Sequence, residues 1–159
     1  MEKKDLKPAG VFKYFEEICQ VPRPSKKEEK MIAYLKAFGA KHNLETKVDE
    51  AGNVLIKKPA TPGKENLQTV VLQSHIDMVC EKNNDVQHDF LTDPIETEID
   101  GEWLKAKGTT LGADNGIGVA TELAILADDS IEHGPLECLF TVDAVSYTHL
   151  RAHETTLHL

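Results

Sequence analysis

One short stretch of this chain places an imidazole and a carboxylate at the end of a predicted strand. The stretch is Ser74-His75-Ile76-Asp77, and it directly follows the apolar run 69–72. Residues two apart in a strand point the same way, so His75 and Asp77 are expected to project together. A neutral imidazole is a good zinc ligand, and a neighbouring carboxylate can fix its tautomer. The pair is therefore either a metal ligand with its orienting partner or a polar pair that merely ends a strand.

A second stretch, residues 111–118, sets Asp114 in a glycine-rich turn at the start of a predicted helix. Small neighbours allow this carboxylate to approach another group closely, although an aspartate there can also simply cap the helix. The glycines match neither the phosphate-binding loop nor the dinucleotide fingerprint. Together with His75, Asp114 offers nitrogen and oxygen ligands without thiolate, which suit zinc, cobalt or manganese. In a two-metal site Asp114 is the candidate bridging carboxylate.

Two helices are predicted before these stretches. An apolar stripe at helical spacing covers residues 11–19, and Pro22 and Pro24 end it. Ser25 and Glu28 have the spacing of a capping box, so we expect the second helix to begin at Ser25. Its predicted buried face is formed by four apolar residues, Met31, Ile32, Leu35 and Phe38.

Strands and a third helix complete the predicted fold. Residues 46–48 and 54–56 flank a turn and predict a hairpin. The continuous apolar run 69–72 is typical of a strand buried on both faces. Residues 81–100 are polar and predict a surface excursion, and residues 102–105 a short strand with Trp103 in the core. A helix over 115–127 and a strand over 136–142 follow, and this alternation indicates the α/β class.

Composition excludes several classes of partner. The chain has 159 residues, with 27 Asp plus Glu against 18 Lys plus Arg, and a net charge of −9. We therefore expect no nucleic acid and no membrane as partner, since phosphate-rich surfaces are bound by clustered positive charge. The N-terminus is too charged for a signal peptide. The three cysteines are widely spaced and indicate reduced thiols, so a cytoplasmic location is expected.

The final residues differ from the rest of the chain. Three of the seven histidines, His149, His153 and His158, fall within the last eleven residues, where no apolar period is present. We interpret residues 145–159 as foreign to the protein, in the manner of sequencing-adapter DNA translated onto a truncated gene. The expected organisation is then 1–144 as the N-terminal part of a catalytic domain and 145–159 as a tail.

The two motifs read together resemble one enzyme family. Residues 75–83 and 108–116, with the opening segments 12–18 and 21–25, are similar to the aminoacyl-histidine (beta-Ala-His) dipeptidases. These belong with tripeptidases, aminoacylases and zinc carboxypeptidases in a family of two-metal peptidases, and the resemblance covers residues 5–143. It implies part of a zinc-exopeptidase-like mixed sheet flanked by helices, here truncated. It also implies a cytosolic metallo-dipeptidase that hydrolyses Xaa-His and related dipeptides, and it allows a homodimer.

The resemblance also implies a role for each site residue. His75 would bind one metal ion, and Asp114 would bridge two divalent ions, zinc in the first place and cobalt or manganese as alternatives. Asp77, the candidate catalytic residue, would orient His75 without being a primary ligand. In the family, two adjacent glutamates follow the position of Asp143. The first is the general base that activates water, and the second is a metal ligand.

This sequence departs from that pattern where the glutamates are expected. Ala144 and Val145 occupy the two positions, and the family's later aspartate and histidine ligands have no counterpart here. Loss of a general base typically lowers a rate by about 10²–10⁴-fold. We therefore expect the 159-residue chain itself to be inactive. Two alternatives remain open: a deacylase or carboxypeptidase of the related families, and a non-catalytic binding module.

Overall fold

The computed structural model describes residues 5–144, and the predicted tail lies outside these residues. A mixed sheet has the strand order β1-β2-β6-β3, with β1 (Glu45–Val48), β2 (Val54–Lys58), β3 (Val70–His75) and β6 (Leu136–Thr141). β2 pairs antiparallel with both β1 and β6, whereas β3 runs parallel to β6. The predicted hairpin and the α/β class are thus confirmed.

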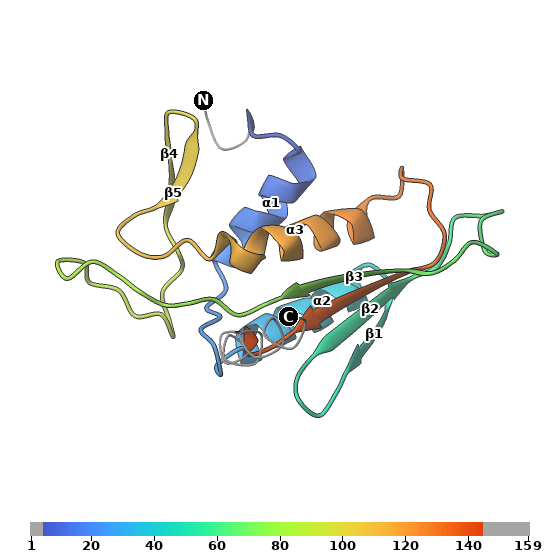
Figure 1. Ribbon diagram of the computed structural model, residues 1–159, viewed down its shortest axis with the longest axis horizontal. Helices are drawn as coiled ribbons and strands as arrows, with labels where there is room; N and C mark the ends of the chain where they lie inside the picture. Colours follow the sequence, from blue (N-terminus) through green and yellow to red (C-terminus); the bar gives the residue numbers. More distant parts are fainter. Residues whose placement is uncertain (1–4, 145–159) are drawn as a thin grey trace, which may run out of the picture.

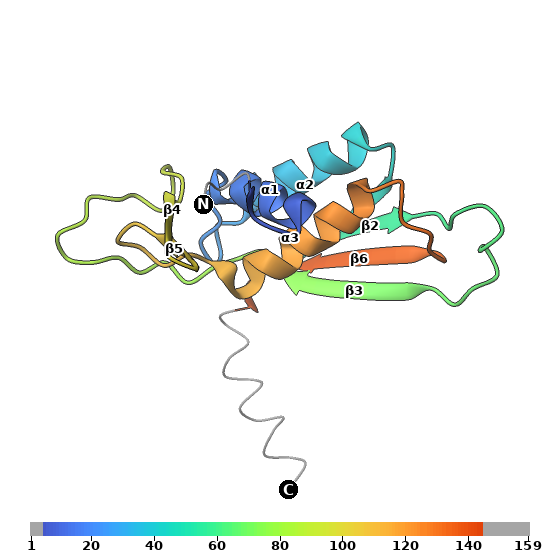
Figure 2. The ribbon, with the colours of Figure 1, turned by 90° about the horizontal axis from the view of Figure 1, so that it is seen from above.

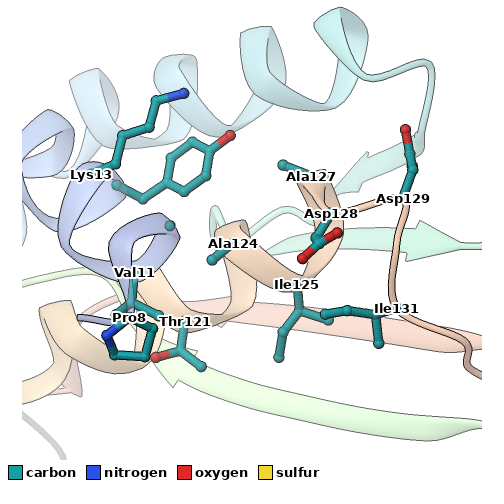
Figure 3. A pocket seen from close by; sticks show the side chains of 12 residues that line it. Pro8, Val11, Lys13, Thr121, Ala124, Ile125, Ala127, Asp128, Asp129 and Ile131 are labelled. Carbon is teal, nitrogen blue, oxygen red and sulfur yellow. The ribbon is translucent and has the colours of Figure 1, made fainter.

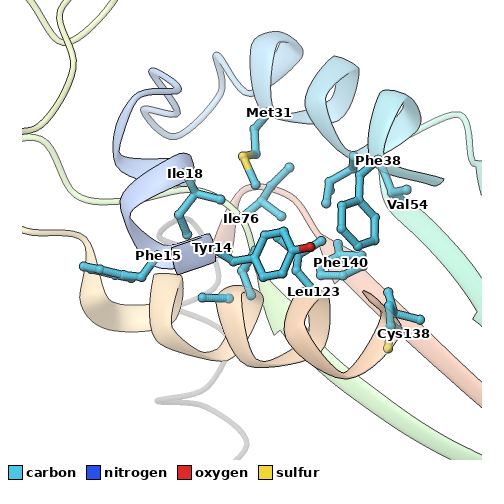
Figure 4. Close-up of a cluster of buried hydrophobic side chains, with 14 of the residues drawn as sticks. Tyr14, Phe15, Ile18, Met31, Phe38, Val54, Ile76, Leu123, Cys138 and Phe140 are labelled. Carbon is cyan, nitrogen blue, oxygen red and sulfur yellow. The ribbon is translucent and has the colours of Figure 1, made fainter. Parts of the chain in front are cut away.

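Residues 5–144 contain three helices, α1 (Ala9–Cys19), α2 (Glu29–Lys41) and α3 (Ala113–Ala127). α3 contacts β3 and α1, while α2 contacts β1 and β2 (Figure 1). Buried and half-buried positions alternate along β2 and β6, as expected of strands with one face against helices. The shared core is drawn in Figure 4 and includes Phe15, Met31, Leu123 and Phe140, each at most 1% exposed.

The start of α2 corrects one expectation. The helix begins at Glu29 instead of Ser25, and no side chain caps its N-terminus by a hydrogen bond. Ser25 donates its hydroxyl hydrogen to Asp77 Oδ2 (2.6 Å) instead of to the helix. Glu28 Oε1 accepts from the amides of Lys26 and Asp143, both at 3.0 Å. The predicted capping box does not form, because Ser25 bonds to Asp77 and Glu28 bonds to the amides of Lys26 and Asp143.

The segment between β3 and α3 contains a second hairpin, of β4 (Thr97–Asp100) and β5 (Trp103–Ala106). It stands apart from the four-stranded sheet in both views (Figures 1 and 2). β4 lies within the stretch that we expected to be a plain surface excursion. Trp103 is 71% exposed, so its predicted place in the core is wrong. Leu104 and Ala106 of β5 pack against the core, and side chains alternate along a strand, so Trp103 lies on the opposite face.

β3 is an edge strand, which corrects the prediction that it is buried on both faces. Val70 and Val71 are 49% and 57% exposed, and within residues 5–144 the outer edge of β3 pairs with no other strand. The edge carries no charged side chain before His75. Apolar, uncharged edges of this kind are prone to pair with other chains.

We therefore expect Val71→Lys to reduce self-association of the polypeptide. A lysine on the edge adds a charge that must be desolvated when two edges meet. Sedimentation velocity at several concentrations measures the change. Val48→Lys is the matched control, because Val48 is exposed on β1, the opposite edge, which already carries Glu45 and Lys47. Equal effects of the two variants would contradict an association through β3.

Candidate metal site

His75 and Asp114 meet at the C-terminal end of β3. β3 ends at His75, and α3 begins just before Asp114, after Gly112 in the left-handed conformation at φ +70°. His75 Nε2 lies 3.0 Å from Asp114 Oδ1. The His75 side chain is 21% exposed and that of Asp114 is 96% exposed. The two motifs, 39 residues apart in sequence, therefore present one nitrogen and one oxygen to solvent at the same place.

Asp77 lies behind His75, out of contact with solvent. His75 Nδ1 is 3.2 Å from Asp77 Oδ1 and 3.1 Å from the Asp77 carbonyl oxygen. Asp77 is fully buried, and its two carboxylate oxygens accept from the Ser25 hydroxyl and from the Ala144 amide. Because both neighbours of Nδ1 are acceptors, Nδ1 carries the proton and Nε2 faces Asp114. This is the arrangement expected of an orienting carboxylate.

The acceptors around the ring also act on its protonation. The hydrogen bond to Asp77 raises the pKa of His75, burial opposes this, and Asp114 raises the pKa further. When Nε2 is unprotonated, its lone pair faces the Asp114 carboxylate, which is unfavourable unless a cation is present. Adjacent ligands of a tetrahedral ion with bonds of about 2.0–2.1 Å lie about 3.3–3.4 Å apart, so the two atoms, now 3.0 Å apart, would have to separate only slightly to hold one ion. The donor set therefore fits a divalent metal ion.

A group of three carboxylates adjoins the site. Oxygen atoms of Glu28, Asp77 and Asp143 all lie within 4.8 Å of one another. Backbone amides of residues 143 and 144 donate to Glu28 and Asp77, at 3.0 and 3.1 Å. These bonds hold the chain that leaves β6 against Asp77. Sequence reasoning missed Glu28 and Ser25 in this role, because their spacing matched a helix cap.

Glu122 is a buried carboxyl group of α3 that lies near the site but not in it. It is 4% exposed, and its Oε2 has no hydrogen-bond partner among the described residues. Burial raises the pKa of Glu122 to about 7, against smaller opposing effects of Ser74 and Cys138. Ser74 directly precedes His75, so the Glu122 carboxyl sits under the strand that carries the site. No sequence signal beyond a charge inside an apolar helix indicates it.

Two other features do not contribute to the site. Burial raises the pKa of the Cys80 thiol, which donates weakly to the Met78 carbonyl, so Cys80 is a poor nucleophile. A cavity of about 480 Å³ lies between α1 and the C-terminal half of α3 (Figure 3). Val11, Ala124 and Ile131 are among the residues that line it, at the opposite end of α3 from Asp114.

Comparison with known proteins identifies the relationship. The chain is 52% identical over 141 residues to the cytosol non-specific dipeptidase of Escherichia coli, covering 89% of this chain. It superposes on the crystal structure of aminoacylhistidine dipeptidase from Vibrio alginolyticus with a TM-score of 0.87 and 54% identity over 90% of this chain. The chain is related to the bacterial dipeptidases. The expected dipeptidase resemblance is thus confirmed.

The relationship covers only part of these dipeptidases. The chain spans 29% of the length of each of the two relatives. A Bacillus subtilis protein, described as a dinuclear metal binding peptidase from the M20 family, shares the fold at a TM-score of 0.51 and 13% identity. No known family profile matches the chain. No helix within residues 5–144 is long and apolar enough to cross a bilayer.

Proposed function

We propose that residues 1–144 form part of the catalytic domain of a metallo-dipeptidase for Xaa-His and related dipeptides. The observation that carries the proposal is the 3.0 Å pairing of His75 Nε2 with Asp114 Oδ1, backed by the buried carboxylate of Asp77. The pairing occurs in a chain 52% identical to a dipeptidase over 141 residues. Two divalent ions, zinc in the first place, are the proposed cofactors, supported by the description of the B. subtilis fold relative.

The chain's own residues would divide the work at this site. His75 Nε2 and Asp114 would hold metal, with Asp114 shared between two ions. Asp77 keeps the proton on Nδ1, so that Nε2 presents its lone pair outward. Bound divalent ions would polarise the scissile carbonyl and lower the pKa of water. The high exposure of Asp114 leaves room for a dipeptide to approach.

The end of β6 is the proposed place of the proton acceptor in the complete family pattern. The Ala144 amide donates to Asp77 Oδ1, so this residue lies beside the partner of His75. A glutamate at 144 would therefore stand next to the site, as the resemblance requires of the general base. Alanine offers no proton acceptor, and this supports the expectation that the 159-residue polypeptide is inactive. The cytoplasm is the proposed location, and a homodimer one possible assembly of the parent enzyme.

Metal titration tests the proposed site. We expect the polypeptide to bind Zn²⁺ or Co²⁺, and His75→Ala to weaken binding at least about 10-fold, because removing part of a ligand shell costs this much or more. Isothermal titration calorimetry measures the affinity, and the cobalt absorption spectrum reports the ligands. His133→Ala is the matched control, since His133 hydrogen-bonds Gly134 on the loop before β6.

One result would contradict the proposed ligand set, and another would contradict the expected inactivity. Metal binding that is equally strong in His75→Ala and the unaltered chain would remove His75 from the ligand set. Hydrolysis of a Xaa-His dipeptide that depends on His75 would show that this polypeptide needs no glutamate at 144, against the expected inactivity.

A further inference from the structure

Arg23 connects the two loops that carry His75 and Asp114. Its side chain is buried, at 2% exposure, in the link between α1 and α2. Nη1 donates to the Ile76 carbonyl (3.0 Å) and more weakly to that of Asp77 (3.4 Å). Nη2 donates to the Gly112 carbonyl at 2.7 Å. One guanidinium group therefore bonds to the backbone next to both proposed ligands.

The shape of the guanidinium suits this task. Its nitrogens lie in one rigid plane, so bonds from Nη1 and Nη2 fix the spacing of the carbonyls they reach. A lysine has a single ammonium on a flexible stem and cannot fix two acceptors in the same way. The backbone of Arg23 adds to the attachment, since its carbonyl accepts from the Met78 amide at 3.1 Å. Farther out, Thr110 joins the same two loops through the Val79 carbonyl.

The glycines around Asp114 make room for this arginine. A Cβ atom on Gly112 or on Gly116 would lie 2.7 Å from Arg23 Nη2. Real Cβ atoms essentially never come this close to another atom. Gly116 also donates its amide to the Gly112 carbonyl at 3.0 Å, the same oxygen that Arg23 binds. The glycine spacing about Asp114 is thus matched to a side chain about ninety residues earlier.

We propose that Arg23 is a positioning residue that sets the spacing between His75 and Asp114. It does so by holding the carbonyls of Ile76 and Gly112 on one guanidinium group. The purpose of this positioning depends on the proposed metal function, but the hydrogen bonds that produce it exist in the chain without metal. The two can therefore be tested separately.

The test compares Arg23→Lys and Arg23→Met with a matched control, Lys58→Met. Lys58 is also a buried cation that donates to backbone carbonyls, those of Ile125 and Asp128, at the far end of α3. Hydrogen exchange of the metal-free protein is followed at Gly112–Gly116 and at Leu123–Leu126, together with urea unfolding. Zn²⁺ affinity is measured by calorimetry on the same samples.

Relative to the unaltered chain, we expect Arg23→Lys to speed up hydrogen exchange more at residues 112–116 than at residues 123–126. We also expect it to weaken Zn²⁺ binding about 10-fold. Lys58→Met should lower stability without this local change and without altering the affinity for Zn²⁺. Should Arg23→Met fail to fold, Arg23→Lys decides the question. Faster local exchange in a chain that binds no Zn²⁺ even unaltered would support positioning and overturn the proposed metal function.

Either of two results would overturn the positioning role. In one, Arg23→Lys exchanges and binds Zn²⁺ like the unaltered chain. In the other, the Arg23 and Lys58 variants lose affinity only in proportion to their loss of global stability, which is what a purely structural contribution predicts.

Discussion

Glu122→Gln should stabilise the protein at pH 8.5 by up to about 3 kcal/mol relative to the unaltered chain. The folded protein holds the proton of Glu122 up to about pH 7, whereas the ordinary pKa is 4.5. Between these values the folded state binds a proton that the unfolded state has released, so stability falls as the pH rises. The difference between 4.5 and about 7 corresponds to about 3 kcal/mol.

Urea unfolding at pH 4.5, 6 and 8.5 measures the effect. The gain in the free energy of unfolding from Glu122→Gln should be small at pH 4.5, grow as the pH rises and level off above about pH 7. Glu122→Leu should show the same pH dependence with a constant offset from apolar burial. Glu102→Gln makes the same chemical change on the exposed surface. A gain that does not vary with pH would contradict the buried-carboxyl explanation.

Gly112→Ala should lower the free energy of unfolding by about 3 kcal/mol. Gly112 has φ +70°, where a Cβ costs about 1–2 kcal/mol. The new methyl group would also lie 2.7 Å from Arg23 Nη2 and 2.8 Å from Met78 Sδ. Displacing Arg23 breaks its bond to the Gly112 carbonyl, and a hydrogen bond from a charged group contributes about 1.5–3 kcal/mol.

Gly101→Ala separates the two causes. Gly101 has φ +61°, yet a Cβ there would meet no atom within 4 Å. This variant should therefore lose only the conformational part, about 1–2 kcal/mol. Urea unfolding of both variants gives the comparison. Equal losses would mean that Arg23 adapts to the methyl group without cost, and that its contact with Gly112 is not tight.

Local pattern was enough to predict most elements of the fold. The apolar stripes and the turn at 51–53 act over a few residues, so α1 and the β1–β2 hairpin follow from sequence alone. The burial of β3 did not follow, because an apolar run looks the same at the edge and at the centre of a sheet. Trp103 was predicted to lie in the core because its side chain is large and apolar. Whether it is buried depends on which face of β5 packs against the rest of the protein.

The residues of the candidate site also fall into those that the sequence predicted and those that it did not. His75 and Asp77 were predicted together because strand geometry relates residues two apart, but β3 ends at His75, and Asp77 is buried behind the ring instead of projecting beside it. Asp114 was predicted from its glycine-rich turn, and the family resemblance implied the same bridging role. Arg23 and Ser25 were missed as members of the site, since each acts across more than fifty residues of sequence. Backbone carbonyls, which Arg23 binds, leave no trace in residue identity. Only the folded chain reveals such contacts.

The strand order has a consequence for the time course of folding. β6 is the inner strand between β2 and β3, and its parallel pairing joins Val70 to Leu136. Contacts between residues so distant in sequence form late, because a long loop must close first. During synthesis, α1, α2 and the β1–β2 hairpin can form early, whereas neither edge of β3 has a partner strand until β6 has been made. The span from residue 70 to residue 136 is therefore the interval in which a nascent chain most needs protection from aggregation.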